Sequence, residues 1–313
     1  VKGTWELVDD ASGTVVDSRR QIVARVPFFT DRGLVIHRGS NYAVGNQPRL
    51  EPGVFVRRRS NGEPDVHVAT MPGQGIGHHY GLDAAKSIFT VRVGQSAAPL
   101  TPLLRILGAT DEEMKAAWGE ELWKANATMQ GDPAIRRVKK AFLRKVDATD
   151  DELRARIAET RLTPEISART LGHPHEVLNK DAILTATKRL LAMTKGEDEG
   201  DDRDDPSYQR VYGPEDMMAE RLLKDSSGVR RRALYEATRE GSLKRIPSGL
   251  LTSQLEHVLL KSGLGQSLEE LNALEPLDKM TRATRLGEGG IPCYSADTEV
   301  YTAAGWKFWP DVR

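Results

Sequence analysis

The chain has 313 residues, one cysteine, and 45 acidic residues against 45 basic ones, so its formal net charge is zero. A chain of this length can form two or three compact units. Zero net charge excludes a general attraction to nucleic acid, so any such contact must come from local patches. The single cysteine excludes an internal disulfide bond and a cysteine-based zinc site. No apolar run reaches the length of about 18 residues that a membrane span needs.

The first part of the chain, residues 1–98, is predicted to be rich in strands. Short β-branched runs alternate there with turn signals. The runs read GTWELV, QIVARVPFF, GLVIH, GVFVRRRS, DVHVATM and SIFTVRV. The pair Asn61-Gly62 lies between the fourth and fifth runs and predicts a hairpin, because both residue types tolerate the positive φ of a tight turn.

After Ala98 the hydrophobic pattern becomes helical. Ser/Thr-x-x-Glu patterns predict where helices begin, because the two side chains can each bond the other residue's backbone N–H. These patterns start at Thr110, Thr149, Ser253 and Ser267. Further helices are expected over residues 176–194 and 214–241, with an acidic stretch that contains glycine and proline between them.

These patterns predict an α+β fold without an internal repeat. We expect a β-rich unit at 1–98, a helical unit at 99–170 and a second helical segment at 171–250. A segment at 251–292 and a short β-hairpin at 293–313 complete the chain.

Several clusters suggest a ligand but also have a simpler interpretation. The glycines of residues 73–77 can cradle a phosphate, but they lack the lysine and hydroxyl residue of a phosphate loop, which favours a plain flexible loop. The pairs His78-His79 and His173-His175 lack a supporting second ligand pair, so no metal site is predicted. The acidic run 197–205 has enough carboxylates for Mg²⁺ but is typical of a solvated loop, and Arg203 within it favours salt bridges.

Two arginine runs can either contact phosphate or form a solvated surface. Arg57, Arg58 and Arg59 lie on a predicted strand, where side chains alternate, so only one face can carry two of them. The run 230–232 lies on a predicted helix.

The segment 261–291 is more specific. Lys279, Arg282 and Arg285 are spaced by three, and a glycine-rich stretch with Gly287, Gly289 and Gly290 follows. Glycine lets the backbone approach a ligand closely. Cations at helical spacing before a glycine loop suit a channel wall that holds phosphates without reading bases.

Four blocks resemble the β subunit, the second-largest subunit, of multisubunit DNA-dependent RNA polymerases, particularly the divergent versions of large bacteriophages. They stand in the family's order and extend over roughly residues 20–291. The blocks are TDRGLVIHRGSNYAVGNQPRLEPGVFVRRRSNGE, APLTPLLRILGATDEEM, GEDEGDDRDDPSYQRVYGPEDMMAERL and the segment from Gln266 to Ile291.

The resemblance implies a partial β subunit that forms part of the nucleic-acid channel near the active centre. Residues 1–95 with part of 170–250 would form the protrusion, 100–170 a reduced lobe, and 251–292 the start of the fork. The nucleic-acid-binding residues would be Gln266, Asn272, Lys279, Arg282 and Arg285.

The resemblance also implies partners. They are the DNA template, the RNA product, a β′-like subunit and the remaining portion of β, in the cytoplasm, or in the host cytoplasm if a phage encodes the chain. The Mg²⁺ of the assembled polymerase would lie on the β′-like subunit, so this chain binds no metal or other cofactor. A rival hypothesis is a scaffold that binds only the partner subunit.

The last residues, CYSADTEVYTAAGW and beyond, resemble the first block of inteins. In that family the Cys293 thiolate would attack the carbonyl of Pro292 and convert an amide to a thioester. The activating histidine and the terminal His-Asn pair are absent from residues 294–313, so we expect Cys293 to be idle here. The alternatives are one half of a split intein, or an ordinary hairpin with a buried cysteine.

Overall fold

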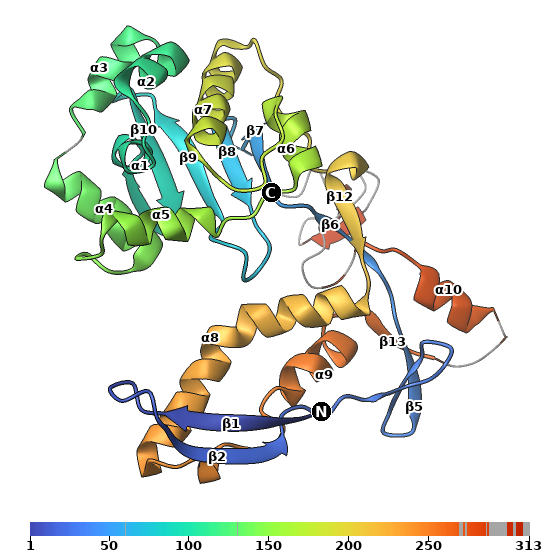
Figure 1. The fold of residues 1–313 in the computed structure, drawn as a ribbon. Helices are drawn as coiled ribbons and strands as arrows, with labels where there is room; N and C mark the ends of the chain where they lie inside the picture. Colours follow the sequence, from blue (N-terminus) through green and yellow to red (C-terminus); the bar gives the residue numbers. More distant parts are fainter. Residues whose placement is uncertain are drawn as a thin grey trace. The chain divides into compact units, whose positions relative to one another are not determined.

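The computed structural model describes residues 1–59, 61–129, 131–268, 272, 274–285, 287, 299–302 and 305–308. The chain forms two compact units (Figure 1). Unit 1 combines Val1–Arg49 with Val211–Arg313, and unit 2 is Leu50–Arg210. The fold is mixed α+β, as predicted. Strands before residue 98 and helices after it share one hydrophobic core within unit 2.

Unit 2 is built on a five-stranded antiparallel sheet with the order β11-β10-β9-β8-β7. Its strands are β7 (Gly53–Arg58), β8 (Pro64–Ala69), β9 (His78–Asp83), β10 (Ile88–Val93) and β11 (Ser96–Pro99). Strands β7 and β8 form the hairpin predicted from Asn61-Gly62, and Gly62 has the positive φ of 83° that this turn requires.

The helices of unit 2 follow the sheet in the chain. They are α1 (Thr101–Ile106), α2 (Asp111–Trp118), α3 (Glu120–Ala127), α4 (Asp132–Leu143), α5 (Asp150–Ala158), α6 (Pro164–Leu171) and α7 (Lys180–Lys195), followed by the 3₁₀ turn η1 (Pro206–Tyr208). The capping boxes predicted at Thr110 and Thr149 are both present. Gly119, with φ 83°, separates α2 from α3.

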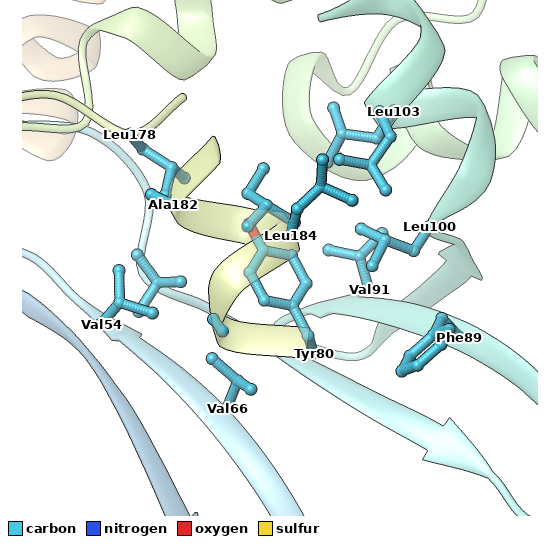
Figure 2. Close-up of a cluster of buried hydrophobic side chains, with 14 of the residues drawn as sticks. Val54, Val66, Tyr80, Phe89, Val91, Leu100, Leu103, Leu178, Ala182 and Leu184 are labelled. Atoms are coloured by element: carbon cyan, nitrogen blue, oxygen red, sulfur yellow. The ribbon is translucent and has the colours of Figure 1, made fainter. Parts of the chain in front are cut away.

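One face of the sheet is buried beneath these helices. Figure 2 shows Val54, Val66 and Tyr80 of the sheet converging with Leu103 of α1 and Ala182 of α7. All five side chains are fully buried, and each large one contributes about 1.5–3 kcal/mol of hydrophobic stabilisation. Because strand residues alternate between faces, the residues between them point to the opposite face.

Unit 1 has two described parts. In the first, β1 (Lys2–Val8) pairs with β2 (Val15–Ile22) beside α8 (Pro214–Glu240), η2 (Leu243–Arg245) and α9 (Thr252–Leu260). A small core joins the strands to the helices: Trp5 and Leu7 pack against a cluster that contains Ala237 and Leu243.

The second part is a four-stranded sheet with the order β13-β5-β4-β3 and the helix α10 (Glu275–Thr281). Its strands are β3 (Phe28–Phe29), β4 (Val35–His37), β5 (Ser40–Val44) and β13 (Gly265–Ser267). Two further pairs are β6 (Gln47–Leu50) with β12 (Gln209–Tyr212), and β14 (Glu299–Thr302) with β15 (Gly305–Phe308). None of the helices in the described ranges is long and apolar enough to cross a membrane.

The other two Ser-x-x-Glu patterns have different outcomes, because a helix does begin beside Ser253, whereas Glu270 of the pattern at Ser267 lies outside the described residues. Ser253 lies inside the first turn of α9, whose N-cap is Leu251 and has no side-chain capping bond. Ser267 belongs to strand β13, where it pairs with Tyr42.

Candidate nucleic-acid interface

The predicted channel-wall segment begins as a strand added to the edge of β5. Gly265, Gln266 and Ser267 pair with Val44, Ala43 and Tyr42, respectively. A Cβ on Gly265 would lie 1.6 Å from the carbonyl oxygen of Leu259, so only glycine allows the chain to pass the end of α9 this closely. The side chain of Gln266 is exposed on this strand.

Asn46 fixes the next part of the segment. Its side-chain Nδ2 donates to the carbonyl of Met280 at 2.9 Å, and its backbone N–H donates to the carbonyl of Arg282 at 2.9 Å. The backbone N–H of Thr284 in turn donates to the carbonyl of Asn46 at 2.8 Å. We call these three bonds the Asn46 clamp. They join the first and last of the sequence blocks described above.

The cations that the sequence placed on one helix face do not share it. Helix α10 ends at Thr281, and Arg282 has the extended backbone angles φ −63° and ψ 127°. The physical reason is the Asn46 clamp, which holds the backbone around Arg282 extended. Lys279 therefore lies on the helix, whereas Arg282 and Arg285 follow it.

Two of these cations are paired with carboxylates of α10. The Nζ of Lys279 lies 2.8 Å from Glu275, and the guanidinium of Arg282 pairs with Asp278. The Arg282 side chain is 55% exposed, whereas that of Lys279 is 21% exposed. Arg282 is thus the more accessible of the two, and Arg285 is partly buried.

Asn272 has a structural role at the start of α10. Its Oδ1 accepts hydrogen bonds from the backbone N–H groups of Leu274 and Glu275, both at 2.9 Å. These bonds satisfy donors that the first turn of a helix leaves open. Sequence reasoning had assigned Asn272 only to nucleic-acid contact.

The glycine stretch is only partly described. Gly287 has φ 95°, and a Cβ there would lie 2.9 Å from the carbonyl oxygen of Ser262. Glycine is therefore needed at this position for backbone packing. Gly289, Gly290 and Cys293 lie outside the described residues. Strands β14 and β15 form an antiparallel pair, which both the intein and the ordinary hairpin interpretation expect.

The other candidate ligand sites have structural explanations. A Cβ on Gly75, which has φ 104°, would lie 2.5 Å from Thr160, so residues 73–77 form a loop packed against the chain. His78 is buried, with its ring nitrogens 2.6 Å from the carbonyl of Ile76 and 2.7 Å from the hydroxyl of Tyr80. Burial lowers the pKa of His78 to about 4. Among the described residues no three His, Cys, Asp or Glu side chains are grouped for a metal ion.

The acidic run 197–205 forms ion pairs, but with a different arginine from the one expected. Arg189 of α7 lies 2.8 Å from Asp198 and 2.9 Å from Asp201. The Asp201 carboxylate also accepts a hydrogen bond from the backbone N–H of Val56 at 2.7 Å. These contacts attach the run to the edge of the unit 2 sheet. Arg203 instead contacts His67, with its Nη1 3.2 Å from Nδ1.

Arg57 and Arg59 meet at a carboxylate that the sequence reasoning missed. Asp65 is fully buried, and its oxygens lie 3.6 Å from the guanidinium of Arg57 and 2.9 Å from that of Arg59. Arg58 points away and donates to the carbonyl of Met193, as strand alternation predicted. The turn signal alone could not have found it, because counting outward from a two-residue Asn61-Gly62 turn places Arg57 opposite Val66, whereas the strands pair Arg57 with Asp65.

The comparisons with known proteins agree with the resemblance of the blocks. The chain is 26% identical over 326 residues to "DNA-directed RNA polymerase subunit beta" of Thermus thermophilus, covering 91% of the chain. It is 22% identical over 341 residues to the subunit of the same name in Corynebacterium glutamicum, covering 95% of the chain. It is 23% identical over 313 residues to the subunit of the same name in Syntrophomonas wolfei, covering 91% of the chain.

The chain is a relative of the RNA polymerase β subunit. It spans 29% of the length of the Thermus and Corynebacterium β subunits and 28% of that of the Syntrophomonas β subunit. No family model matches the chain. The similarity to the β subunit extends through both units, since the stretches compared cover nine-tenths of the chain.

Proposed function

We propose that the chain forms part of the β subunit of a DNA-directed RNA polymerase and contributes to template-directed RNA synthesis in the assembled enzyme. Its similarity to β subunits over nine-tenths of its length supports this function. The observation that carries the proposal is the Asn46 clamp, which joins the first and the last of the four blocks that resemble the family.

In this proposal the segment from Gln266 to Gly287 is a wall of the nucleic-acid channel. Arg282 is exposed and lies beside Asp278, so a phosphate must compete with that carboxylate. A cation that is already paired holds a phosphate weakly, which suits a surface along which nucleic acid moves. The other residues that we propose to contact the nucleic-acid backbone are Gln266, Asn272, Lys279 and Arg285.

The chemistry in this proposal belongs to the complete enzyme. A β′-like subunit supplies the Mg²⁺ ligands for nucleotidyl transfer, and this chain contacts the DNA template, the RNA product and the remaining portion of β. The enzyme works in the cytoplasm, which is a host's cytoplasm if a bacteriophage encodes the chain.

A binding experiment tests the role of the channel wall. We expect the chain to bind an RNA–DNA hybrid with an affinity that falls steeply with salt, because phosphate contacts release counterions. Arg282→Ala should weaken binding, whereas Arg239→Ala, which replaces an exposed arginine on α8 of the same unit, should not. A scaffold that binds only its partner subunit would show no salt-dependent binding to the hybrid. Equal effects of the two substitutions would also contradict the proposed wall.

A second candidate function concerns the end of the chain. We propose that residues 293–313 begin an intein, because their sequence resembles the family's first block; the pairing of β14 with β15 agrees with this and equally with an ordinary hairpin. The Cys293 sulfur would bond to the Pro292 carbonyl carbon while the C–N bond breaks and the amine takes a proton.

Complementation tests the intein proposal. The chain is mixed with a second chain that carries the missing histidine blocks, and the mass at the Pro292–Cys293 bond is followed. Cleavage or splicing that Cys293→Ala abolishes supports the proposal, and an unchanged mass contradicts it.

A further inference from the structure

The face of the unit 2 sheet opposite Val54, Val66 and Tyr80 carries a group of basic side chains. Part of this face is covered, because Phe55 of β7 and Ala69 of β8 pack there against Ile166 of α6. On that face Arg57 stands opposite Asp65, His67 opposite His79, and His79 opposite Arg92. We call the group of Asp65, Arg57, Arg59, His79 and Arg92, with the adjacent His67 and Arg203, the Asp65 cluster.

Asp65 holds several side chains of this cluster in place. Its side chain is fully buried, and its two oxygens lie 2.9 Å from Arg59, 2.8 Å from Arg92 and 2.8 Å from His79. Burial alone would raise the pKa of Asp65, but the hydrogen bonds from His79 and Arg59 outweigh it and hold the pKa below its usual value. Asp65 is therefore a carboxylate that fixes the orientation of several guanidinium groups.

Gly81 opens the route by which Arg92 reaches Asp65. It lies on β9, next in sequence to Tyr80, and is buried. A Cβ on Gly81 would lie 3.3 Å from the Nη2 of Arg92, so the guanidinium passes over a position without a side chain. Arg92 of β10 and Arg59, which follows β7, therefore meet at the same carboxylate, although they approach it from opposite sides of β8.

The cluster has more positive charge than its carboxylates balance. The cluster contains four arginines. The carboxylates that offset them are Asp65 and Asp204, which lies near Arg203, so two positive charges remain in excess. His67 adds none at neutral pH, because burial first and then its cationic neighbours lower its pKa to about 3. Burial and the nearby Arg57 also lower the pKa of Arg203, a sign that like charges are crowded here.

The arginines also keep hydrogen-bonding capacity. The Nε groups of Arg57 and Arg92 are buried and have no hydrogen-bond partner within the described part of the chain. The side chains of Arg57, Arg59 and Arg92 are 26%, 25% and 34% exposed, so each is partly accessible to solvent. Each guanidinium carries five N–H donors in a planar fork that fits phosphate oxygens.

We propose that the Asp65 cluster is a binding site for a phosphate group, separate from the channel-wall segment of unit 1. Arg59 and Arg92 form the two sides of the site, and Arg57 and Arg203 add charge. Buried Asp65 holds the arginines in place without facing the ligand. The ligand is either the backbone of a nucleic acid or a free phosphate compound, since both offer the same oxygens to the arginine forks.

Binding measurements on the whole 313-residue chain test the site. The probes are a short fluorescent DNA duplex, followed by anisotropy, and inorganic pyrophosphate, followed by calorimetry, both at low salt. We expect the double variant Arg59→Gln/Arg92→Gln to bind about tenfold or more weakly to whichever probe the parent chain binds. For the duplex, the slope of log affinity against log salt should also fall by about one for each arginine–phosphate interaction that the substitutions remove.

Matched variants separate the site from a general charge effect. Arg137→Gln removes one charge from an exposed position on α4 of the same unit and should leave affinity unchanged. Arg92→Lys keeps the charge but loses the fork, so it should retain binding better than Arg92→Gln, and circular dichroism should show that both remain folded. Binding of the duplex alone indicates a nucleic-acid backbone, and binding of pyrophosphate indicates a free phosphate compound.

Three results would overturn the proposal. They are no binding of either probe, an equal loss in Arg137→Gln, or binding that Arg282→Ala abolishes and the Arg59/Arg92 variant does not change. The last result would leave the proposed channel wall of unit 1 intact, so the two proposals fail independently.

Discussion

Asn46 and Met280 are joined by a hydrogen bond of 2.9 Å from a side-chain amide to a backbone carbonyl, across 234 positions of sequence. The backbone of Asn46 bonds the same segment twice more, at Arg282 and Thr284. The side-chain bond is the part of the Asn46 clamp that a substitution can remove without altering the backbone.

The Asn46 clamp gives the first prediction. Asn46→Ala should weaken the local structure at residues 280–284 by about 1–3 kcal/mol, because the Met280 carbonyl loses its donor. Asn46→Asp should be worse, since a carboxylate would face a carbonyl oxygen. Hydrogen exchange of the Arg282 and Thr284 amides measures this, with Asn61→Ala in an exposed turn as the control. Unchanged exchange in both Asn46 variants would show that the backbone bonds suffice.

The pairing of Arg282 with Asp278 predicts that one substitution strengthens the binding of nucleic acid. Asp278→Asn should increase the affinity for an RNA–DNA hybrid several-fold, because it releases Arg282 from its carboxylate and removes a negative charge near the phosphates. Arg282→Ala should have the opposite effect. Both affinities are measured at several salt concentrations, and a loss of affinity in Asp278→Asn would mean that the ion pair itself forms the binding surface.

The buried carboxylate of unit 2 gives a stability prediction. Asp65→Asn should lower the free energy of unfolding of unit 2 by about 2 kcal/mol, because it leaves partly buried arginines without their counter-charge. Asp151→Asn removes a pair with Arg154 in which Asp151 is 87% exposed, and should cost less than about 1 kcal/mol. Because the chain has two units, hydrogen exchange of the β7–β10 amides is the suitable measurement. Equal costs would refute the role assigned to Asp65.

The buried histidine predicts how stability depends on pH. Below about 6.5 the unfolded chain protonates His78, whereas the folded chain resists protonation down to its lowered pKa of about 4. The unfolded state thus binds more protons in this window, so the stability of unit 2 should fall as pH decreases, by about 3 kcal/mol at most. His67 acts in the same direction down to about pH 3.

A non-titrating variant checks this pH dependence. His78→Gln should be less stable than the parent chain near neutral pH but should lose less stability between about pH 6.5 and 4. Denaturant titrations across that range, followed by exchange of the unit 2 amides, compare the two chains. Parallel curves would exclude His78 as the source.

The sequence predicted those features that depend on neighbouring residues. The capping boxes at Thr110 and Thr149 and the turn at Asn61-Gly62 need only residues within a few positions, and all three are present. At Ser267 the same pattern begins on a strand residue that pairs with Tyr42, a partner that local sequence does not specify.

The candidate site shows the same limit. The resemblance of the blocks located the segment around Arg282, but the spacing of its cations predicted one helix face where the Asn46 clamp ends the helix. In unit 2, alternation placed Arg57 and Arg59 on one face. The convergence of Arg92 and His79 on Asp65 depends on the order of strands β8, β9 and β10 in the sheet, which spacing along the chain does not encode.

The pairing of β5 with β13 has a consequence for how the protein is made. A ribosome synthesises β5 early and then all of unit 2 before it reaches Gly265–Ser267, the strand that covers the edge of β5. Throughout that interval the N–H and C=O groups on this edge of the newly made chain lack their final partner, and open strand edges promote aggregation. Nascent chains stalled before Gly265 should therefore depend on chaperones more than chains released after Ser267.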